Sequence, residues 1–119
     1  MVTLNSFKYA FKGLRLVLSS ERNARIHLVF ALMAVLLGFI LQIEPSHWVL
    51  LILAIALVFF AEIVNTAIEK TLDLLATENN QIVRIVKDMT AAGVLVCAVA
   101  AALIGVAVFL PKILQMLGR

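Results

Sequence analysis

Residues 48–73 decide the fold of this chain, and they read WVLLILAIALVFFAEIVNTAIEKTLD. The first half, residues 48–61, has no polar side chain apart from the indole N–H of Trp48. The second half carries four polar side chains at spacings of 3, 4 and 4 residues: Glu62, Asn65, Glu69 and Asp73. At about 100° per residue these four fall within an arc of roughly 80° on one face of a helix. The stretch therefore predicts a long helix that begins apolar and ends in an acidic stripe.

The acidic stripe carries three carboxylates on one helix face, next to an apolar segment. Carboxylates in this position repel one another and lose hydration, so each carries a cost in free energy. We expect such a stripe where a positive group, such as a metal ion, lies against it. The alternative is that Glu62, Asn65 and Glu69 only make polar contacts between helices. The acidic stripe is the candidate active site.

The composition of the chain indicates a membrane protein. Of its 119 residues, 64% are hydrophobic and only 14% are charged. The mean hydropathy is +1.11. A soluble domain of this size could not cover so much apolar surface, and the length allows one domain. We expect no nucleic-acid partner.

Residues 5–20 predict an amphipathic helix that lies on the membrane surface. One face carries an apolar stripe: Phe7, Phe11, Leu14 and Leu18. Another face carries basic side chains that can meet anionic headgroups: Lys8, Lys12 and Arg15. A polar hinge from Glu21 to Arg25 follows it.

Three apolar runs predict membrane-spanning helices at about 26–43, 48–76 and 82–110. Residues 44–47 predict a tight turn, and Pro111 predicts the end of the last span. At ~1.5 Å per residue the second span would measure about 43 Å, against ~30 Å for the hydrocarbon core. The acidic stripe therefore begins near the membrane interface and extends into the headgroup layer. The expected fold is an all-α integral membrane domain over residues 1–119.

Basic residues near the predicted spans gather on the side of the acidic stripe: Lys8, Lys12, Arg15, Arg22, Arg25, Lys70, Arg84 and Lys87. The opposite side has only Lys112 and Arg119. By the positive-inside rule, the acidic stripe faces the cytoplasm.

Carboxylates and a lysine at a membrane surface suit phosphoryl transfer to a lipid alcohol. Mg²⁺ prefers oxygen ligands, and one or two carboxylates together with phosphate oxygens can hold it. Glu62 lies nearest the apolar segment and suits a general base, whereas Glu69 is better placed to hold a metal ion. Lys87 can reach phosphate, and Asp88 can orient either Lys87 or the metal shell.

Other interpretations of these residues remain open. No glycine-rich phosphate-binding loop is present in the sequence, so nucleotide binding has no independent motif. Arg84 and Asp88 have the spacing of an ordinary helical ion pair. For His27, the alternative to a role as a ligand is a hydrogen bond at the membrane interface. A small proton- or ion-coupled transporter could use the same carboxylates, although a relay should place polar groups through the depth of the membrane.

Three segments resemble the small prokaryotic diacylglycerol kinase family, which includes the undecaprenol kinases. They are Glu62-Ile-Val-Asn65-Thr-Ala-Ile-Glu69-Lys-Thr-Leu-Asp73, Glu21-Arg-Asn-Ala-Arg25-Ile-His27 and Lys87-Asp88-Met89. The resemblance implies a homotrimer with three spans per subunit, in the bacterial cytoplasmic membrane, whose active sites are shared between neighbouring subunits. It also implies transfer of the γ-phosphate of ATP to the hydroxyl of undecaprenol or diacylglycerol, with Mg²⁺.

The resemblance also implies roles for individual residues. Glu62 resembles the catalytic base, and Glu21 and Glu69 resemble the metal ligands. Nucleotide contacts are implied for Tyr9, Glu21, Glu69, Glu78, Asn79, Asn80, Lys87 and Asp88. Asn65 and Asp73 match supporting positions, and lipid-substrate contacts are implied for Arg25, His27 and Glu62.

Two positions depart from the family pattern. Asn79-Asn80 stands where an aromatic residue and a histidine are frequent, and Ser6 stands where an arginine precedes Phe7. Both departures concern the binding of adenine and the lipid headgroup. The segment from Glu21 to His27 is more similar to the undecaprenol kinase branch, while the acceptor stays open between undecaprenol and diacylglycerol.

Overall fold

The structure, a computed structural model, describes residues 3–75 and 80–118, and in these ranges it consists of four α-helices. They are α1 (Leu4–Ser20), α2 (Arg22–Leu41), α3 (Pro45–Leu75) and α4 (Gln81–Leu117). Helices α2, α3 and α4 are each long and apolar enough to cross a membrane. The predicted all-helical fold with three such helices is confirmed.

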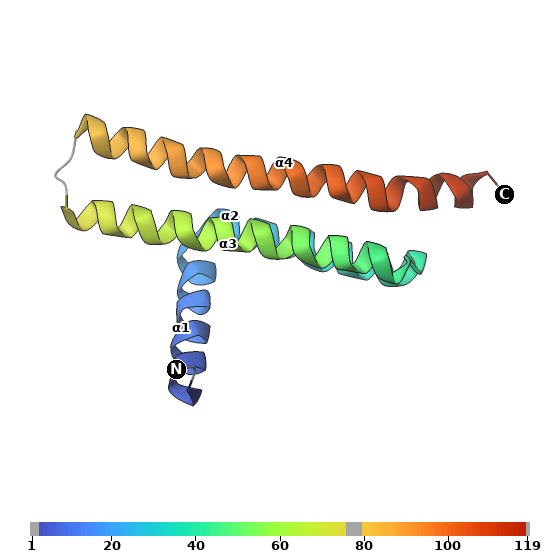
Figure 1. The fold of residues 1–119 in the computed structure, drawn as a ribbon, viewed down its shortest axis with the longest axis horizontal. Coiled ribbons are helices and arrows are strands. Elements are labelled where there is room, and N and C mark those ends of the chain that lie inside the picture. The colour runs from blue at the N-terminus through green and yellow to red at the C-terminus, as the bar shows by residue number, and fades with distance from the viewer. Residues whose placement is uncertain (1–2, 76–79, 119) are drawn as a thin grey trace.

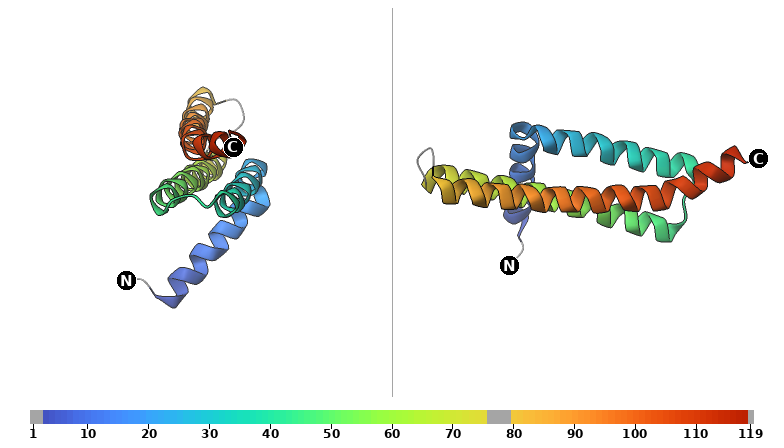
Figure 2. Two further views of the ribbon diagram at one scale, coloured as in Figure 1. Left: turned by 90° about the vertical axis from the view of Figure 1, so that its right-hand side faces the viewer. Right: turned by 90° about the horizontal axis from the view of Figure 1, so that it is seen from above.

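The three long helices run along one axis of the molecule, and α1 leaves them at a steep angle (Figure 1). The molecule measures 61 × 38 × 23 Å. Helix α4 lies along α3, its most extensive neighbour, and α2 packs against both α3 and α4, so the three form a bundle (Figure 2). A small core of buried side chains closes the end near the α2–α3 turn: Leu41, Ile43, Leu51, Val108 and Phe109.

The junction between α1 and α2 is shorter than predicted. Only Glu21 is non-helical there, with φ −111° and ψ 116°. Arg22 to Arg25 form the first turn of α2, so the predicted five-residue hinge is wrong. The break at Glu21 lets α1 end and α2 begin without an intervening loop.

The turn between α2 and α3 also differs from the prediction. Helix α2 ends at Leu41, because Gln42 is in the left-handed conformation (φ 52°) and its N–H bonds to the carbonyls of Gly38 and Phe39. Helix α3 then begins at Pro45, earlier than the predicted start at Trp48. Proline suits the first position of a helix because its φ is already helical and its missing N–H needs no partner there. The predicted end of this span at residue 76 lies outside the described residues.

Helix α4 continues through Pro111 to Leu117, so the predicted end at residue 110 is wrong. Proline removes one backbone hydrogen bond and favours a kink, but it does not always end a helix. Ile113 packs against the buried core beyond the proline. This contact favours continuation of the helix.

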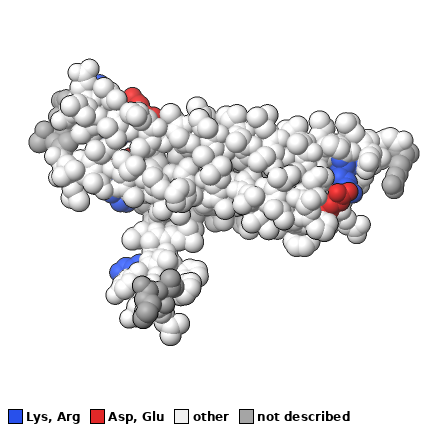
Figure 3. Space-filling model, in the orientation of Figure 1, with Lys and Arg blue, Asp and Glu red and all other residues white. Residues whose placement is uncertain are grey.

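The outer surface of the long helices is largely apolar. Large side chains such as Phe30, Phe39 and Phe60 are about two-thirds exposed. On the face drawn in Figure 3, charged side chains lie near the two ends of the long helices and on α1, and the middle has none. This distribution matches a lipid-facing band between two polar zones.

Candidate active site

Glu62 is the centre of the candidate active site. It lies on the buried face of α3 together with Val58 and Thr66, and its side chain is only 2% exposed. His27 of α2 approaches it, with 3.4 Å between His27 Nε2 and Glu62 Oε1. This is ion-pair distance for a protonated His27, although Glu62 Oε1 makes no hydrogen bond of good geometry among the described residues. A buried carboxylate without a full set of partners is typical of a functional site.

Two further carboxylates act on Glu62. Glu21, at the junction of α1 and α2, and Glu69, further along α3, both lie close enough to repel its charge. Both side chains are partly exposed. The fold therefore gathers acidic groups from two segments at one end of the long helices.

Mg²⁺ is the cofactor that the resemblance implies, and the acidic groups fit it by their chemistry. Among residues 3–75 and 80–118, no three His, Cys, Asp or Glu side chains gather tightly enough to form a metal site alone. Mg²⁺ needs only one or two carboxylates when phosphate oxygens and water complete its shell. Glu21 and Glu69 satisfy this requirement.

Two uncharged side chains accompany Glu62 on α3. Asn65 Oδ1 and Thr66 Oγ1 are both buried and find no hydrogen-bond partner in the described part of the chain. Asn65 was predicted to belong to the site, whereas Thr66 was not. Thr66 stands four residues after Glu62, on the same helix face, and this spacing is the sequence signal that could have identified Thr66.

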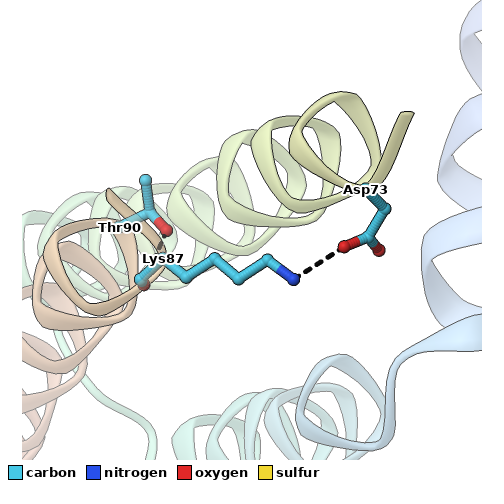
Figure 4. Close-up of polar contacts among 3 residues, drawn as sticks. All are labelled: Asp73, Lys87 and Thr90. Carbon is cyan, nitrogen blue, oxygen red and sulfur yellow. Dashed lines mark hydrogen bonds and ion pairs between the residues drawn. The ribbon is translucent and has the colours of Figure 1, made fainter. Parts of the chain in front are cut away.

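Lys87 is held by Asp73 across the α3–α4 interface. Lys87 Nζ donates to Asp73 Oδ1 at 2.6 Å, as Figure 4 shows. Asp88 was predicted to orient Lys87, and the structure gives this role to Asp73. Thr90 bonds to the Lys87 carbonyl at 3.0 Å. Asp88 is exposed, and the ion pairs of the described residues do not include Arg84 with Asp88.

Arg25 was expected near the lipid, and its guanidinium contacts the end of α1. Nη1 donates to the carbonyls of Leu18 and Ser19, at 3.0 Å each. These are carbonyls of the last turn of α1, which carries partial negative charge. Arg25 therefore caps α1 and braces the corner that contains Glu21.

The remaining predicted nucleotide contacts are dispersed. Tyr9 is 68% exposed on α1. Asn80 caps α4, and its Oδ1 accepts from the N–H groups of Ile82 and Val83 at 2.9 and 3.2 Å. Glu78 and Asn79 lie outside the described residues.

An apolar cavity of about 360 Å³ lies among α2, α3 and α4. Phe30, Ala54, Ala98 and Phe109 are among its lining residues. His27 is the ionisable side chain in this lining, and it is the residue that contacts Glu62. The cavity therefore borders His27, the neighbour of Glu62, while Glu62 itself is not one of its lining residues.

The sequence profile described as "Prokaryotic diacylglycerol kinase" matches residues 8–109. The chain belongs to this family. An undecaprenol kinase of Bacillus subtilis (strain 168) is 34% identical over 108 residues, which cover 91% of this chain and 88% of the relative. A diacylglycerol kinase of Synechocystis sp. is 32% identical over 115 residues, covering 96% of this chain and 66% of the relative.

A diacylglycerol kinase of Escherichia coli (strain K12) is 36% identical over 93 residues, which cover 78% of this chain and 76% of the relative. These relatives are all named as lipid kinases. As a member of the same family, this chain is a lipid kinase. The transporter interpretation receives no support.

Proposed function

We propose that the protein transfers the γ-phosphate of ATP to the hydroxyl of a membrane lipid alcohol, either undecaprenol or diacylglycerol. The observation that carries this proposal is the position of Glu62, buried on α3 against His27 beside an apolar cavity. A carboxylate there can meet a hydroxyl whose chain stays in an apolar environment. The segment from Glu21 to His27 favours undecaprenol.

Glu62 acts as general base in this reaction. The O–H bond of the acceptor breaks and its proton passes to the Glu62 carboxylate, while the acceptor oxygen forms a bond to the γ-phosphorus. The bond between that phosphorus and the β–γ bridging oxygen breaks, and ADP leaves. A base within hydrogen-bond reach of the attacking hydroxyl typically contributes about 10²- to 10⁴-fold in rate.

The other charged groups bind the nucleotide. Lys87, held by Asp73, contacts the phosphates, and Asp88, Asn80 and Tyr9 are further candidate contacts, together with Glu78 and Asn79. Glu21 and Glu69 would hold Mg²⁺, which offsets phosphate charge when it is bound. Because Arg25 braces the corner at Glu21, it also positions this metal ligand.

The membrane arrangement follows from the same groups. Helix α1 lies on the cytoplasmic surface of the membrane, and the acidic groups face the cytoplasm, where ATP is available. The chain assembles as a homotrimer with active sites shared between neighbouring subunits. The angle at which α1 leaves the long helices and the exposed apolar side chains of those helices support this arrangement.

Replacement of Glu62 tests the proposal. We expect Glu62→Gln to lower kcat by about 10²-fold or more, because the amide cannot accept the proton at a useful rate. Phosphate transfer is measured with purified protein in detergent, labelled ATP and either diacylglycerol or undecaprenol. Comparison of the two lipids identifies the acceptor.

The matched control is Glu44→Gln. Glu44 is exposed in the α2–α3 turn, at the other end of α3 from the acidic groups, and should tolerate the change. Near-normal activity of Glu62→Gln in a protein of unchanged oligomeric state would refute the role of Glu62.

A further inference from the structure

The hydroxyl of Thr66 differs from the other hydroxyls inside the helices. A serine or threonine within a helix usually bonds back to the carbonyl three or four residues earlier. Ser20 bonds in this way to Leu16 at 2.7 Å, and Thr71 bonds to Ala67 at 2.8 Å. Thr66 Oγ1 makes no such bond and has no other partner among the described residues, although the residue is only 2% exposed.

Glu62 lies on the preceding turn of α3, next to Thr66, and is likewise a buried polar residue. Glu62 is also 2% exposed, and Oε1 lacks a hydrogen bond of good geometry. The two residues are four positions apart, so their side chains lie on one face, one above the other. Buried polar groups are nearly always satisfied, by protein or by a bound molecule. A bound molecule that lies beside these two side chains can satisfy both.

The chemistry of the two groups identifies the molecule that fits. An ionised carboxylate only accepts hydrogen bonds, whereas a threonine hydroxyl can donate one as well. A hydroxyl group satisfies both, because it donates to Glu62 and accepts from Thr66. Water satisfies the same pair before an alcohol arrives.

We propose that Thr66 binds the hydroxyl of the acceptor lipid, donating a hydrogen bond to the oxygen that Glu62 deprotonates. This inference rests on the proposed function. One lone pair of the acceptor oxygen accepts from Thr66, and the other faces the γ-phosphorus. As the new O–P bond forms, the O–H proton passes to Glu62 and ADP leaves. Val58, one turn before Glu62, and His27, which contacts Glu62, both line the apolar cavity.

The test compares Thr66→Val with Thr66→Ser in the full-length protein. Valine keeps the shape and removes the hydroxyl, so kcat/KM for the lipid should fall roughly 10- to 100-fold, as expected for loss of one hydrogen bond in a buried site. The KM for ATP should stay unchanged. Thr66→Ser keeps the hydroxyl and should retain most of the activity.

Thr71→Val is the matched control, because the Thr71 hydroxyl is already bonded to its own helix and the side chain is exposed. It should behave like the unmodified protein. If Thr66→Val does not fold, Thr66→Ala and Thr66→Ser form a second pair of smaller side chains that differ only in the hydroxyl.

Unchanged lipid kinetics in Thr66→Val, or equal losses in the alanine and serine variants, would overturn this inference. If Glu62→Gln is inactive in the same experiment, the proposed function stands even though Thr66 has no role. If Glu62→Gln is active, the proposed function itself fails. The two failures are thus distinguishable.

Discussion

In the proposed function, the ion pair between Lys87 and Asp73 serves phosphate binding while contributing little to stability. Its 2.6 Å distance is short, but the two side chains are 36% and 63% exposed. Exposed pairs are weakened by water and salt, so they add little to the free energy of folding. What the pair does supply is a fixed position for the Lys87 ammonium. In the proposed function, Asp73 is therefore a positioning residue for phosphate binding.

Replacement of Lys87 by methionine separates the contribution of this side chain to phosphate binding from its contribution to stability. We expect the KM for ATP to rise about tenfold or more, because a cation on the phosphates is lost. The temperature of unfolding in detergent should hardly change. Steady-state kinetics and thermal unfolding of the same preparation measure both quantities.

Asp73→Asn is the companion variant, since it keeps Lys87 and removes its charged partner. A smaller rise in the KM for ATP is expected. An unchanged KM for ATP in Lys87→Met would remove Lys87 from the nucleotide site.

The helices themselves are joined by close local contacts rather than by long loops. Arg25 closes the α1–α2 corner by donating to two carbonyls of α1. At the other end of α2, the ring of Trp48 packs on Phe39, with 4.8 Å between ring centroids. Gly38 lies beneath this indole, so helices α2 and α3 approach closely there.

Substitution of Gly38 should weaken the α2–α3 contact. A Cβ at this position would lie 2.7 Å from Trp48 Cη2 and 3.2 Å from Ile43 Cδ1. The indole is rigid and already packed, so Gly38→Ala should lower the free energy of unfolding by about 1–3 kcal/mol. Thermal or denaturant unfolding in detergent measures the change.

Gly13→Ala in α1 provides the control, because a Cβ there meets nothing within 4 Å. It should be neutral, or stabilising by up to about 1 kcal/mol, since alanine favours the helix. Equal stability of both variants would show that the indole moves aside at no cost.

At the scale of the whole molecule, a single chain exposes much apolar surface. It also brings together only some of the residues of the proposed nucleotide site. Glu62, Glu21 and Glu69 lie near one another, whereas Tyr9 is exposed on α1 and Lys87 is paired on α4. Side chains from a neighbouring subunit would complete such a site. This is the structural motivation for the shared active sites of the proposed trimer.

Mixing two variants tests the shared site, at an ATP concentration far below the KM, where each variant alone is strongly impaired. Glu62→Gln and Lys87→Met are unfolded together and refolded as a mixture, so that subunits exchange. If the base and the phosphate-binding lysine of one site come from different subunits, some mixed trimers contain an intact site, and the activity of the mixture should rise well above that of either variant alone. Each variant refolded alone is the control. A mixture no more active than the two variants measured separately, although mixed trimers have formed, would place both residues of a site on one subunit.

The sequence by itself determined the helices and the helix face that carries the acidic stripe. Apolar length and helical spacing are local properties, so residues 48–73 predicted both a span and its acidic stripe. The family resemblance added Glu21, which no local pattern indicates. Helix ends were less predictable, as Pro45 and Pro111 show, because packing beyond a proline decides whether it begins, kinks or ends a helix.

Only the tertiary structure decided which faces meet. It brought His27 to Glu62, turned Arg25 toward the end of α1, and paired Lys87 with Asp73 instead of Asp88. It also showed that the Thr66 hydroxyl is buried without a partner among the described residues. Helical periodicity places a side chain on a face, but the partner of that face comes from a distant part of the chain. That choice depends on the packing of whole helices, which no local spacing records.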